Sequence, residues 1–301
     1  MVLCITGGIS MNVTPNIYVM GDLHGKYQPV RDFYLRNKIE MIKKNRNTAN
    51  DNVLILLGDA GINYFLDSDS RDMKLKKKLG TYPFTYFVVR GNHEERPSNL
   101  AMKNPEAWEW QEFFGGPVLV EKEFPYIKYA SDVPEIYHIP YVADYSEGTE
   151  ENDWCDEGEP IIKTWTTFVL PGAYSVDKDY RLAMGYSWFK DEQMTEEEKD
   201  SGLCDLEHLG YKCDIVLSHT CPIIFEPTDL FLPMIDQSTV DKGMERYLGQ
   251  IEYLLDYKLW MWGHYHAFRD YPRTDGKKKI MLFNDVVNLE QVLYDDTVER
   301  L

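Results

Sequence analysis

The sequence LWMWGHYHAF, residues 259–268, places His264 and His266 just after a run of apolar residues. Such a run is typical of a buried strand, and Gly263, which follows it, allows the backbone to turn sharply. The chain has only 7 histidines among 301 residues, so two at the end of one strand are unusual. Because alternate side chains of an extended segment point the same way, both imidazoles can reach one cluster of metal ions.

Four other apolar runs end in the same manner, with polar residues directly after the last apolar one. These ends are Gly21-Asp22-Leu23-His24, Gly58-Asp59, Gly91-Asn92-His93-Glu94 and Ser218-His219. Ligands of open α/β sheets bind at the carboxyl ends of strands, so we expect these side chains to converge on one point. A ligand set that mixes Asp, His and Asn favours Mn, Fe or Zn over Ca or Mg. Two such ions about 3.5–4 Å apart stabilise both the attacking and the leaving oxygen of phosphoryl transfer.

Strands and helices alternate early in the chain, and strands dominate later. Helical spacing after the first strand predicts one shared apolar face, made of Val30, Phe33, Tyr34, Ile39 and Ile42. Further helices are predicted over residues 195–209 and 241–257, the first of them directly before the strand at 213–220. This order predicts an α/β fold in which two packed sheets are covered by helices.

No convincing linker interrupts this order, so we expect one domain over residues 12–301. Residues 1–11 are interpreted as a loose N-terminal leader, because they lack the features of a signal peptide and precede the first predicted strand. The segment SEGTEENDWCDEGEP, residues 146–160, is acidic and rich in turn-forming residues, which predicts a surface loop.

The composition of the chain limits the kinds of partner that the protein is expected to bind. Lys and Arg number 32 against 50 Asp and Glu, a formal net charge of −18, which argues against a protein that coats long nucleic acids. No apolar stretch is long enough to span a bilayer, so no membrane partner is expected. The 5 cysteines are odd in number and form no CxxC pair, which predicts reduced thiols and a cytoplasmic location. The oligomeric state is left open.

The motifs DLH, GD, GNHE, SH and GHYH together resemble the calcineurin-like metallophosphoesterase superfamily. They follow the order of that family from Asp22 to His266, which is most of the chain. Each motif alone is weak evidence, but five in order, each after a strand-like run, are specific. The resemblance implies a four-layer α/β/β/α sandwich of two mixed β-sheets, in agreement with the α/β pattern.

The resemblance also implies two divalent metal ions, Mn, Fe or Zn. Their ligands would lie at the strand ends: Asp22, His24 and His266 for the first ion, Asp59 for both, and Asn92, His219 and His264 for the second. His93 would contact the phosphate or protonate the leaving oxygen, and Asn92 would help to neutralise the phosphate. The nucleophile would be a hydroxide that bridges the metals, because metal binding lowers the pKa of water toward 7.

The chain departs from the Ser/Thr protein phosphatase branch of this superfamily. That branch carries GDxVDRG at the second motif, where this chain has GDAGINYF. Ile62 therefore replaces an aspartate that orients the catalytic histidine there, and the phosphate-binding arginine is missing. A protein phosphatase of that branch is disfavoured.

The orientation of His93 and the positive charge that binds the phosphate must therefore come from other residues. Glu94 and Asn63 are candidates to orient His93, and Arg96 or Arg90 to supply positive charge. Arg96 is predicted, together with Asn92 and His93, to bind the substrate.

Three functions remain open. The preferred one is a metal-dependent phosphoesterase, with phosphomonoesters slightly favoured. The alternative is a nucleotide or cyclic-nucleotide phosphodiesterase, and the third is a metal-binding scaffold without activity. The substrate is expected to be a phosphate ester of a small molecule, a nucleotide or a phosphopeptide.

Overall fold

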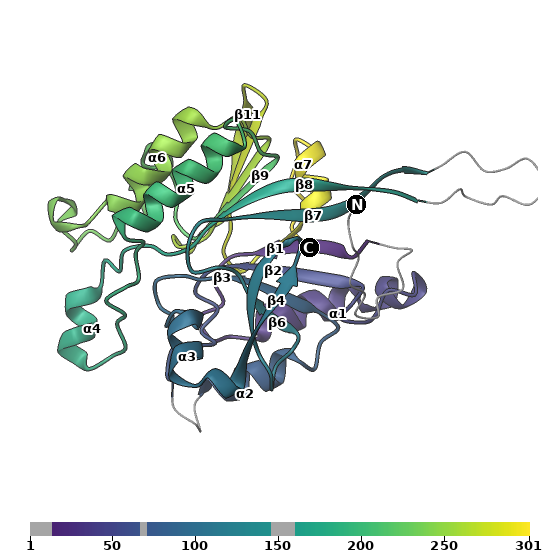
Figure 1. Cartoon of the computed structure of the whole chain (residues 1–301), viewed down its shortest axis with the longest axis horizontal. Helices are drawn as coiled ribbons and strands as arrows, with labels where there is room; N and C mark the ends of the chain where they lie inside the picture. The colour runs from purple at the N-terminus through teal and green to yellow at the C-terminus, as the bar shows by residue number, and fades with distance from the viewer. Residues whose placement is uncertain (1–13, 67–70, 146–159) are drawn as a thin grey trace, which may run out of the picture.

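Two mixed β-sheets pack face to face in the computed structural model, which describes residues 14–66, 71–145 and 160–301 (Figure 1). The first sheet has seven strands in the order β13 (Val286–Asn288), β1 (Asn16–Met20), β2 (Asn52–Leu57), β3 (Thr85–Val89), β6 (Ile127–Tyr129), β5 (Gly116–Glu121) and β4 (Trp108–Phe113). Strands β1, β2, β3 and β6 are parallel, whereas β13, β5 and β4 run antiparallel to their neighbours.

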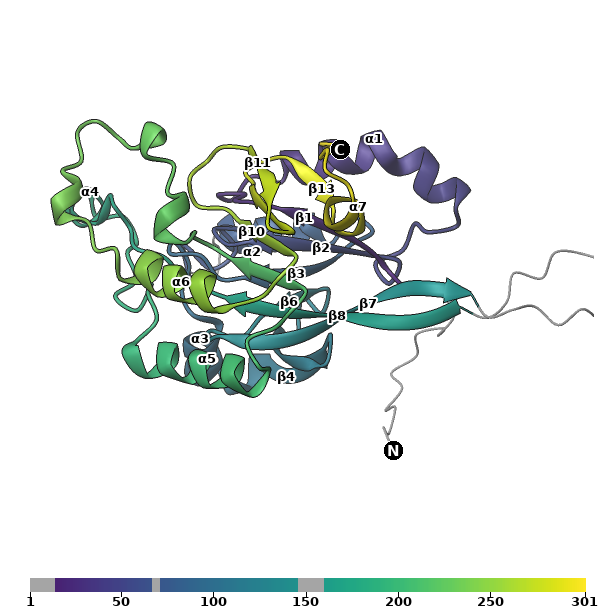
Figure 2. The ribbon, with the colours of Figure 1, turned by 90° about the horizontal axis from the view of Figure 1, so that it is seen from above.

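The second sheet has six strands in the order β11 (Arg269–Thr274), β12 (Lys277–Met281), β10 (Leu259–Trp262), β9 (Ile215–Ser218), β8 (Pro160–Leu170) and β7 (Glu135–Tyr145). Strands β12, β10, β9 and β8 are parallel, and the edge strands β11 and β7 are antiparallel. Strands β7 and β8 form a long hairpin that extends beyond the rest of the molecule (Figure 2). The predicted acidic loop at 146–160 and the predicted leader at 1–11 lie outside the described residues, except for Pro160 in β8.

Helices cover the outer face of each sheet. Helices α1 (Gln28–Lys43) and α2 (Arg71–Leu79) bury Phe33 and Leu75 against the first sheet. Helices α5 (Glu196–His208) and α6 (Gly243–Leu254) bury Leu206 and Leu248 against the second. The four-layer α/β/β/α sandwich expected from the sequence is therefore confirmed. The short helices are α3 (Pro97–Lys103), α4 (Lys178–Met184), α7 (Leu289–Tyr294), η1 (Pro105–Ala107), η2 (Ile223–Phe225), η3 (Thr228–Leu230) and η4 (Gln237–Thr239).

The apolar core between the sheets explains why the strand sequences are so hydrophobic. Ile55 of β2 and Leu217 of β9 belong to one buried cluster that joins both inner faces. Neighbouring residues such as Leu56 point instead toward the helices, so β2 is buried throughout. A strand that is covered on both faces reads as a continuous apolar run rather than an alternating one.

The predicted apolar face of α1 is wrong at two positions. Ile39 and Ile42 are 68% and 52% exposed, whereas Val30, Phe33 and Met41 are buried. At 3.6 residues per turn, Ile39 lies two and a half turns after Val30 and therefore on the opposite side of the helix. Met41 completes the buried face instead.

Candidate metal centre

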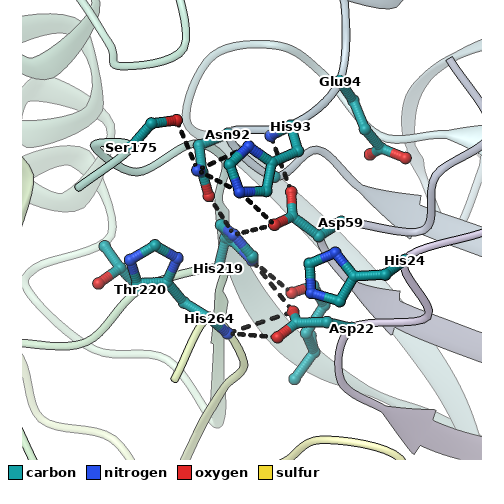
Figure 3. Close-up of polar contacts among 12 residues, drawn as sticks. Asp22, His24, Asp59, Asn92, His93, Glu94, Ser175, His219, Thr220 and His264 are labelled. Carbon is teal, nitrogen blue, oxygen red and sulfur yellow. Dashed lines mark hydrogen bonds and ion pairs between the residues drawn. The ribbon is translucent and has the colours of Figure 1, made fainter. Parts of the chain in front are cut away.

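The seven predicted metal ligands meet at the carboxyl ends of five strands, and all of them except His266 are labelled in Figure 3. Asp22 and His24 follow β1, Asp59 follows β2, and Asn92 follows β3 in the first sheet; His219 follows β9, and His264 and His266 follow β10 in the second. Because β1, β2 and β3 are parallel neighbours, and so are β9 and β10, their ends lie side by side. The site therefore forms where the ends of the two sheets face each other.

Asp22, His24 and His266 form one ligand group. One ligand atom from each lies within 4.8 Å of the other two. Nε2 of His24 is 2.6 Å from Nε2 of His266, and the latter is 3.8 Å from Oδ2 of Asp22. The backbone N–H of His264 donates to both oxygens of Asp22, at 3.2 and 3.0 Å, which fixes the orientation of this carboxylate.

His219 is at the centre of the second group. Its Nε2 lies 2.8 Å from Oδ1 of Asn92 and 3.6 Å from Oδ2 of Asp59. Its Nδ1 lies 2.8 Å from the carbonyl oxygen of Leu57, on the opposite sheet. The ring of His264 is 5.0 Å from that of His219, centroid to centroid. His219, Asp59 and Asn92 are almost fully buried.

Four of the predicted ligands adopt a left-handed backbone conformation. The φ angles are 47° at His24, 42° at Asp59, 71° at His264 and 52° at His266. Residues other than glycine rarely adopt such angles, and strain of this kind clusters at functional sites. The local backbone is thus shaped to direct these side chains toward the site.

The glycines of the motifs make room for ligands from neighbouring strands. A Cβ atom on Gly58 would lie 2.0 Å from Nδ1 of His219, and one on Gly91 would lie 2.1 Å from Oδ1 of Asp59. Glycine is therefore required here because a ligand side chain passes close to the backbone.

The site concentrates buried charge. Burial raises the pKa of Asp22 to about 8; nearby His219 opposes this rise and Asp59 adds to it. Burial lowers the pKa of His219, but the carboxylates of Asp59 and Asp22 outweigh it and raise the value to about 9. Burial likewise lowers the pKa of His24, to about 4. The buried carboxylates and the imidazole of His219 thus each shift the pKa of the other.

The donor atoms fit divalent cations. The carbonyl of Leu57 can only accept, so Nδ1 of His219 carries the hydrogen, and Nε2 of the neutral ring has a free electron pair. That electron pair faces two oxygens, Oδ1 of Asn92 and Oδ2 of Asp59, while the amide nitrogen of Asn92 donates to Ser175 at 2.8 Å. The facing Nε2 atoms of His24 and His266 repeat the pattern. Electron-pair donors that face one another need a proton or a cation between them.

His93 lies at the edge of this centre, with 16% of its side chain exposed. Its backbone N–H donates to Oδ1 of Asp59 at 2.9 Å, and its Nε2 is 3.8 Å from Oδ2 of the same carboxylate. Nη2 of Arg181, from α4, is 3.0 Å from this Nε2. Burial lowers the pKa of His93, Asp59 opposes that effect, and Arg181 adds to it.

Sequence reasoning missed two supports of the site. Arg181 contacts His93, and Ser175 accepts a hydrogen bond from the amide nitrogen of Asn92 while its own hydroxyl donates to buried Glu192. Ser175 and Arg181 lie 5 and 11 residues after the end of β8, too far for the strand-end pattern to reach. The only signal was the spacing of Asp177 and Arg181, which form an i,i+4 ion pair.

Arg96, which the sequence predicts to bind the substrate, is paired with another residue of the protein. Its guanidinium is buried and paired with both oxygens of Glu198, at 2.5 and 3.1 Å. Arg90 is buried too, with its Nε 3.3 Å from Asp132. Both cations are thus occupied by structural partners, and the structure does not bring Arg96 to the metal centre.

Neither proposed partner of His93 contacts its ring. Glu94 accepts hydrogen bonds from the backbone N–H groups of Gly61 and Ile62, at 2.7 and 3.2 Å. It thus holds the loop after β2. The backbone carbonyl of Asn63 accepts from Glu95.

A pocket of about 220 Å³ adjoins the centre. Five site residues line one part of it: Asp59, Asn92, His93, His264 and His266. Apolar side chains from one segment line another part: Leu230, Phe231, Leu232, Ile235 and Val240. Lys242 also lines the pocket, but its Nζ lies 2.6 Å from Glu226 and is therefore already paired.

The fold and the donor set together define a two-sheet sandwich with a cluster of candidate metal ligands at its strand ends. The sequence model of the calcineurin-like phosphoesterases matches residues 15–268, and the chain belongs to this family. Membership implies a hydrolase that acts on phosphate esters, and members typically use two divalent metal ions. No curated protein sequence matches the chain.

Several solved structures are distantly similar. A phosphopantetheinyl hydrolase from Mycobacterium tuberculosis is 14% identical, with 97% of each chain covered and a TM-score of 0.39. A protein from Thermus thermophilus is 12% identical, with 96% of this chain and 99% of that one covered and a TM-score of 0.38. A dimetal phosphatase from Danio rerio is 11% identical, with 92% of this chain and 93% of that one covered and a TM-score of 0.43.

Among the described residues, no helix combines the length and the apolar character that crossing a membrane requires.

Proposed function

We propose that this chain hydrolyses phosphomonoesters with two divalent metal ions held at the strand ends. The observation that carries the proposal is the convergence of electron-pair donors from both sheets, centred on Nε2 of His219 and on the paired Nε2 atoms of His24 and His266. Bound there, the metals would lower the pKa of water and neutralise phosphate charge. The mixture of carboxylate, amide and imidazole donors favours Mn, Fe or Zn.

The protein residues then have separate tasks. Asp22, His24 and His266 would hold one ion, Asn92, His219 and His264 the other, and Asp59 would serve both. His93, partly open to the pocket, would contact the phosphate or protonate the leaving oxygen.

The pocket beside the centre suits the alcohol part of the ester. Its apolar side chains, such as Phe231 and Ile235, would exclude water from that part of the substrate. We expect a small organic ester to bind here. A cytoplasmic location remains part of the proposal, and it agrees with Cys204, Cys213 and Cys221, which form no disulfide in the described part of the chain.

The direct test is hydrolysis of p-nitrophenyl phosphate by purified protein with added Mn, Fe or Zn. We expect metal-dependent turnover that is lost on chelation and falls at least a thousandfold in Asp59→Asn. Asp72→Asn is the matched control, because Asp72 is also buried but binds the backbone of Phe65 and Leu66. Turnover that survives exhaustive chelation, or an equal loss in both variants, would reject the proposal.

The same assay addresses the alternatives. A clear preference for bis(p-nitrophenyl) phosphate or cyclic nucleotides would assign a phosphodiesterase instead. Metal binding without turnover of any phosphate ester would point to a scaffold.

A further inference from the structure

Arg181 contacts His93 at the edge of the proposed catalytic centre, although it belongs to none of the strand-end motifs. It is part of α4, which follows β8 in the second sheet. Nη2 of Arg181 is 3.0 Å from Nε2 of His93, and 15% of the arginine side chain is exposed. A cation is thus held next to His93 in a chain that lacks the phosphate-binding arginine of the protein phosphatase branch.

The guanidinium is held in place by its other partners. Its Nε donates to the carboxylate of Asp177 at 2.8 Å, and its Nη1 donates to the hydroxyl of Tyr64 at 3.1 Å. Asp177 is also the residue that precedes α4, so the ion pair spans one helical turn. A side chain fixed in this way loses little conformational entropy when it binds a ligand.

Part of the donor capacity of Arg181 is still unused. A guanidinium has five N–H groups, and the contacts with Asp177, Tyr64 and His93 engage three of them within the described part of the chain. One N–H on each terminal nitrogen is left. Two such donors match the oxygens of a phosphate, which arginine binds in a bidentate manner.

We propose that Arg181 binds the non-bridging oxygens of the substrate phosphate and thereby selects phosphomonoesters over phosphodiesters. The inference rests on the proposed phosphoesterase function. A monoester carries two negative charges near neutral pH and a diester one, so an added cation favours the monoester. Arg181 keeps the ring of His93 in place with one N–H of Nη2 while the remaining donors meet the phosphate.

The test compares two esters with the same leaving group, p-nitrophenyl phosphate and p-nitrophenyl methyl phosphate. In Arg181→Gln we expect kcat/KM for the monoester to fall by about tenfold to a hundredfold, the effect of a lost charge-assisted hydrogen bond. The value for the diester should fall much less, and Arg181→Lys should retain part of the preference. Lys178→Gln is the matched control, because Lys178 carries the same charge in the same helix but lies over the ring of Trp188, at 4.3 Å.

A second measurement does not depend on turnover. Calorimetry of inorganic phosphate binding to the manganese-loaded protein should show affinity about tenfold weaker in Arg181→Gln than in wild type and Lys178→Gln. An equal loss for both esters, or unchanged phosphate affinity, would overturn the role of Arg181. A wild-type protein that cleaves neither ester contradicts the proposed function, whereas the calorimetric comparison still decides whether Arg181 binds phosphate.

Discussion

Gly58→Ala is predicted to inactivate the protein by displacing one imidazole ring. The new Cβ would lie 2.0 Å from Nδ1, 2.5 Å from Cγ and 2.7 Å from Cε1 of His219. Ordinary van der Waals contact begins near 3.4 Å, so the ring must move by about 1.4 Å. This movement breaks the hydrogen bond to Leu57 and turns Nε2 away from Asn92 and Asp59.

Misplacement of a catalytic group by about 1 Å can cost roughly a hundredfold in rate. We therefore expect kcat/KM for p-nitrophenyl phosphate to fall at least a hundredfold, with manganese affinity weakened by about tenfold to a hundredfold. Alanine also strains the left-handed backbone of Gly58, where φ is 89°, by roughly 1–2 kcal/mol.

The variant Gly276→Ala separates the effect of backbone strain from the effect of the displaced His219 ring. Gly276 has a φ of 77°, but an added Cβ would meet no atom within 4 Å. In urea unfolding both variants should thus lose about 1–2 kcal/mol from backbone strain, and Gly58→Ala should lose more because the ring of His219 is displaced, whereas only Gly58→Ala should lose activity and metal. If Gly58→Ala kept its activity and manganese affinity within threefold of Gly276→Ala, the geometry assigned to His219 would be refuted.

Three further variants test the supports of the site. Ser175→Ala should lower kcat/KM about tenfold, measured with saturating manganese, because the amide of Asn92 loses the partner that fixes its orientation. Glu94→Ala should destabilise the fold by about 1–3 kcal/mol in urea unfolding, because the N–H of Gly61 loses its acceptor, and Glu94→Gln should recover most of that loss. Arg96→Ala should cost about 1–3 kcal/mol of stability, because the half-buried carboxylate of Glu198 loses its charged partner, but should leave KM for phosphate esters unchanged.

These outcomes can each be contradicted separately. Full activity in Ser175→Ala would show that the orientation of Asn92 does not depend on this hydroxyl. Equal loss in both Glu94 variants would assign the carboxylate charge, rather than its acceptor oxygen, as the stabilising feature. A rise in KM for the folded Arg96→Ala protein would restore Arg96 as a substrate ligand.

The sequence predicted the two sheets and the convergence of the metal-ligand candidates at their strand ends, because both depend on local patterns. A strand that is buried on both faces has a continuous run of apolar residues. The residues that follow such a run lie at the carboxyl end of the strand, where ligands bind in α/β sheets. Asp59 after β2 and His219 after β9 could therefore be placed near one another without knowledge of the tertiary structure.

The remaining parts of the site depend on contacts between distant segments. Arg181 reaches His93 across 88 positions of sequence, and the hydroxyl of Ser175 meets Asn92 across 83. Neither follows a strand directly, so no periodic pattern marks it. The pairing of Arg96 could not be predicted either, because its position close to His93 in sequence gives no information about Glu198, the carboxylate that it pairs with 102 residues later.

Anomalous diffraction at the manganese edge, from crystals grown with excess manganese, tests the central claim most directly. We expect two peaks about 3.5–4 Å apart. One should lie among Asp22, His24 and His266, the second should contact Asn92, His219 and His264, and Asp59 should contact both. No peak between these side chains, or manganese bound only elsewhere on the protein, would contradict the account.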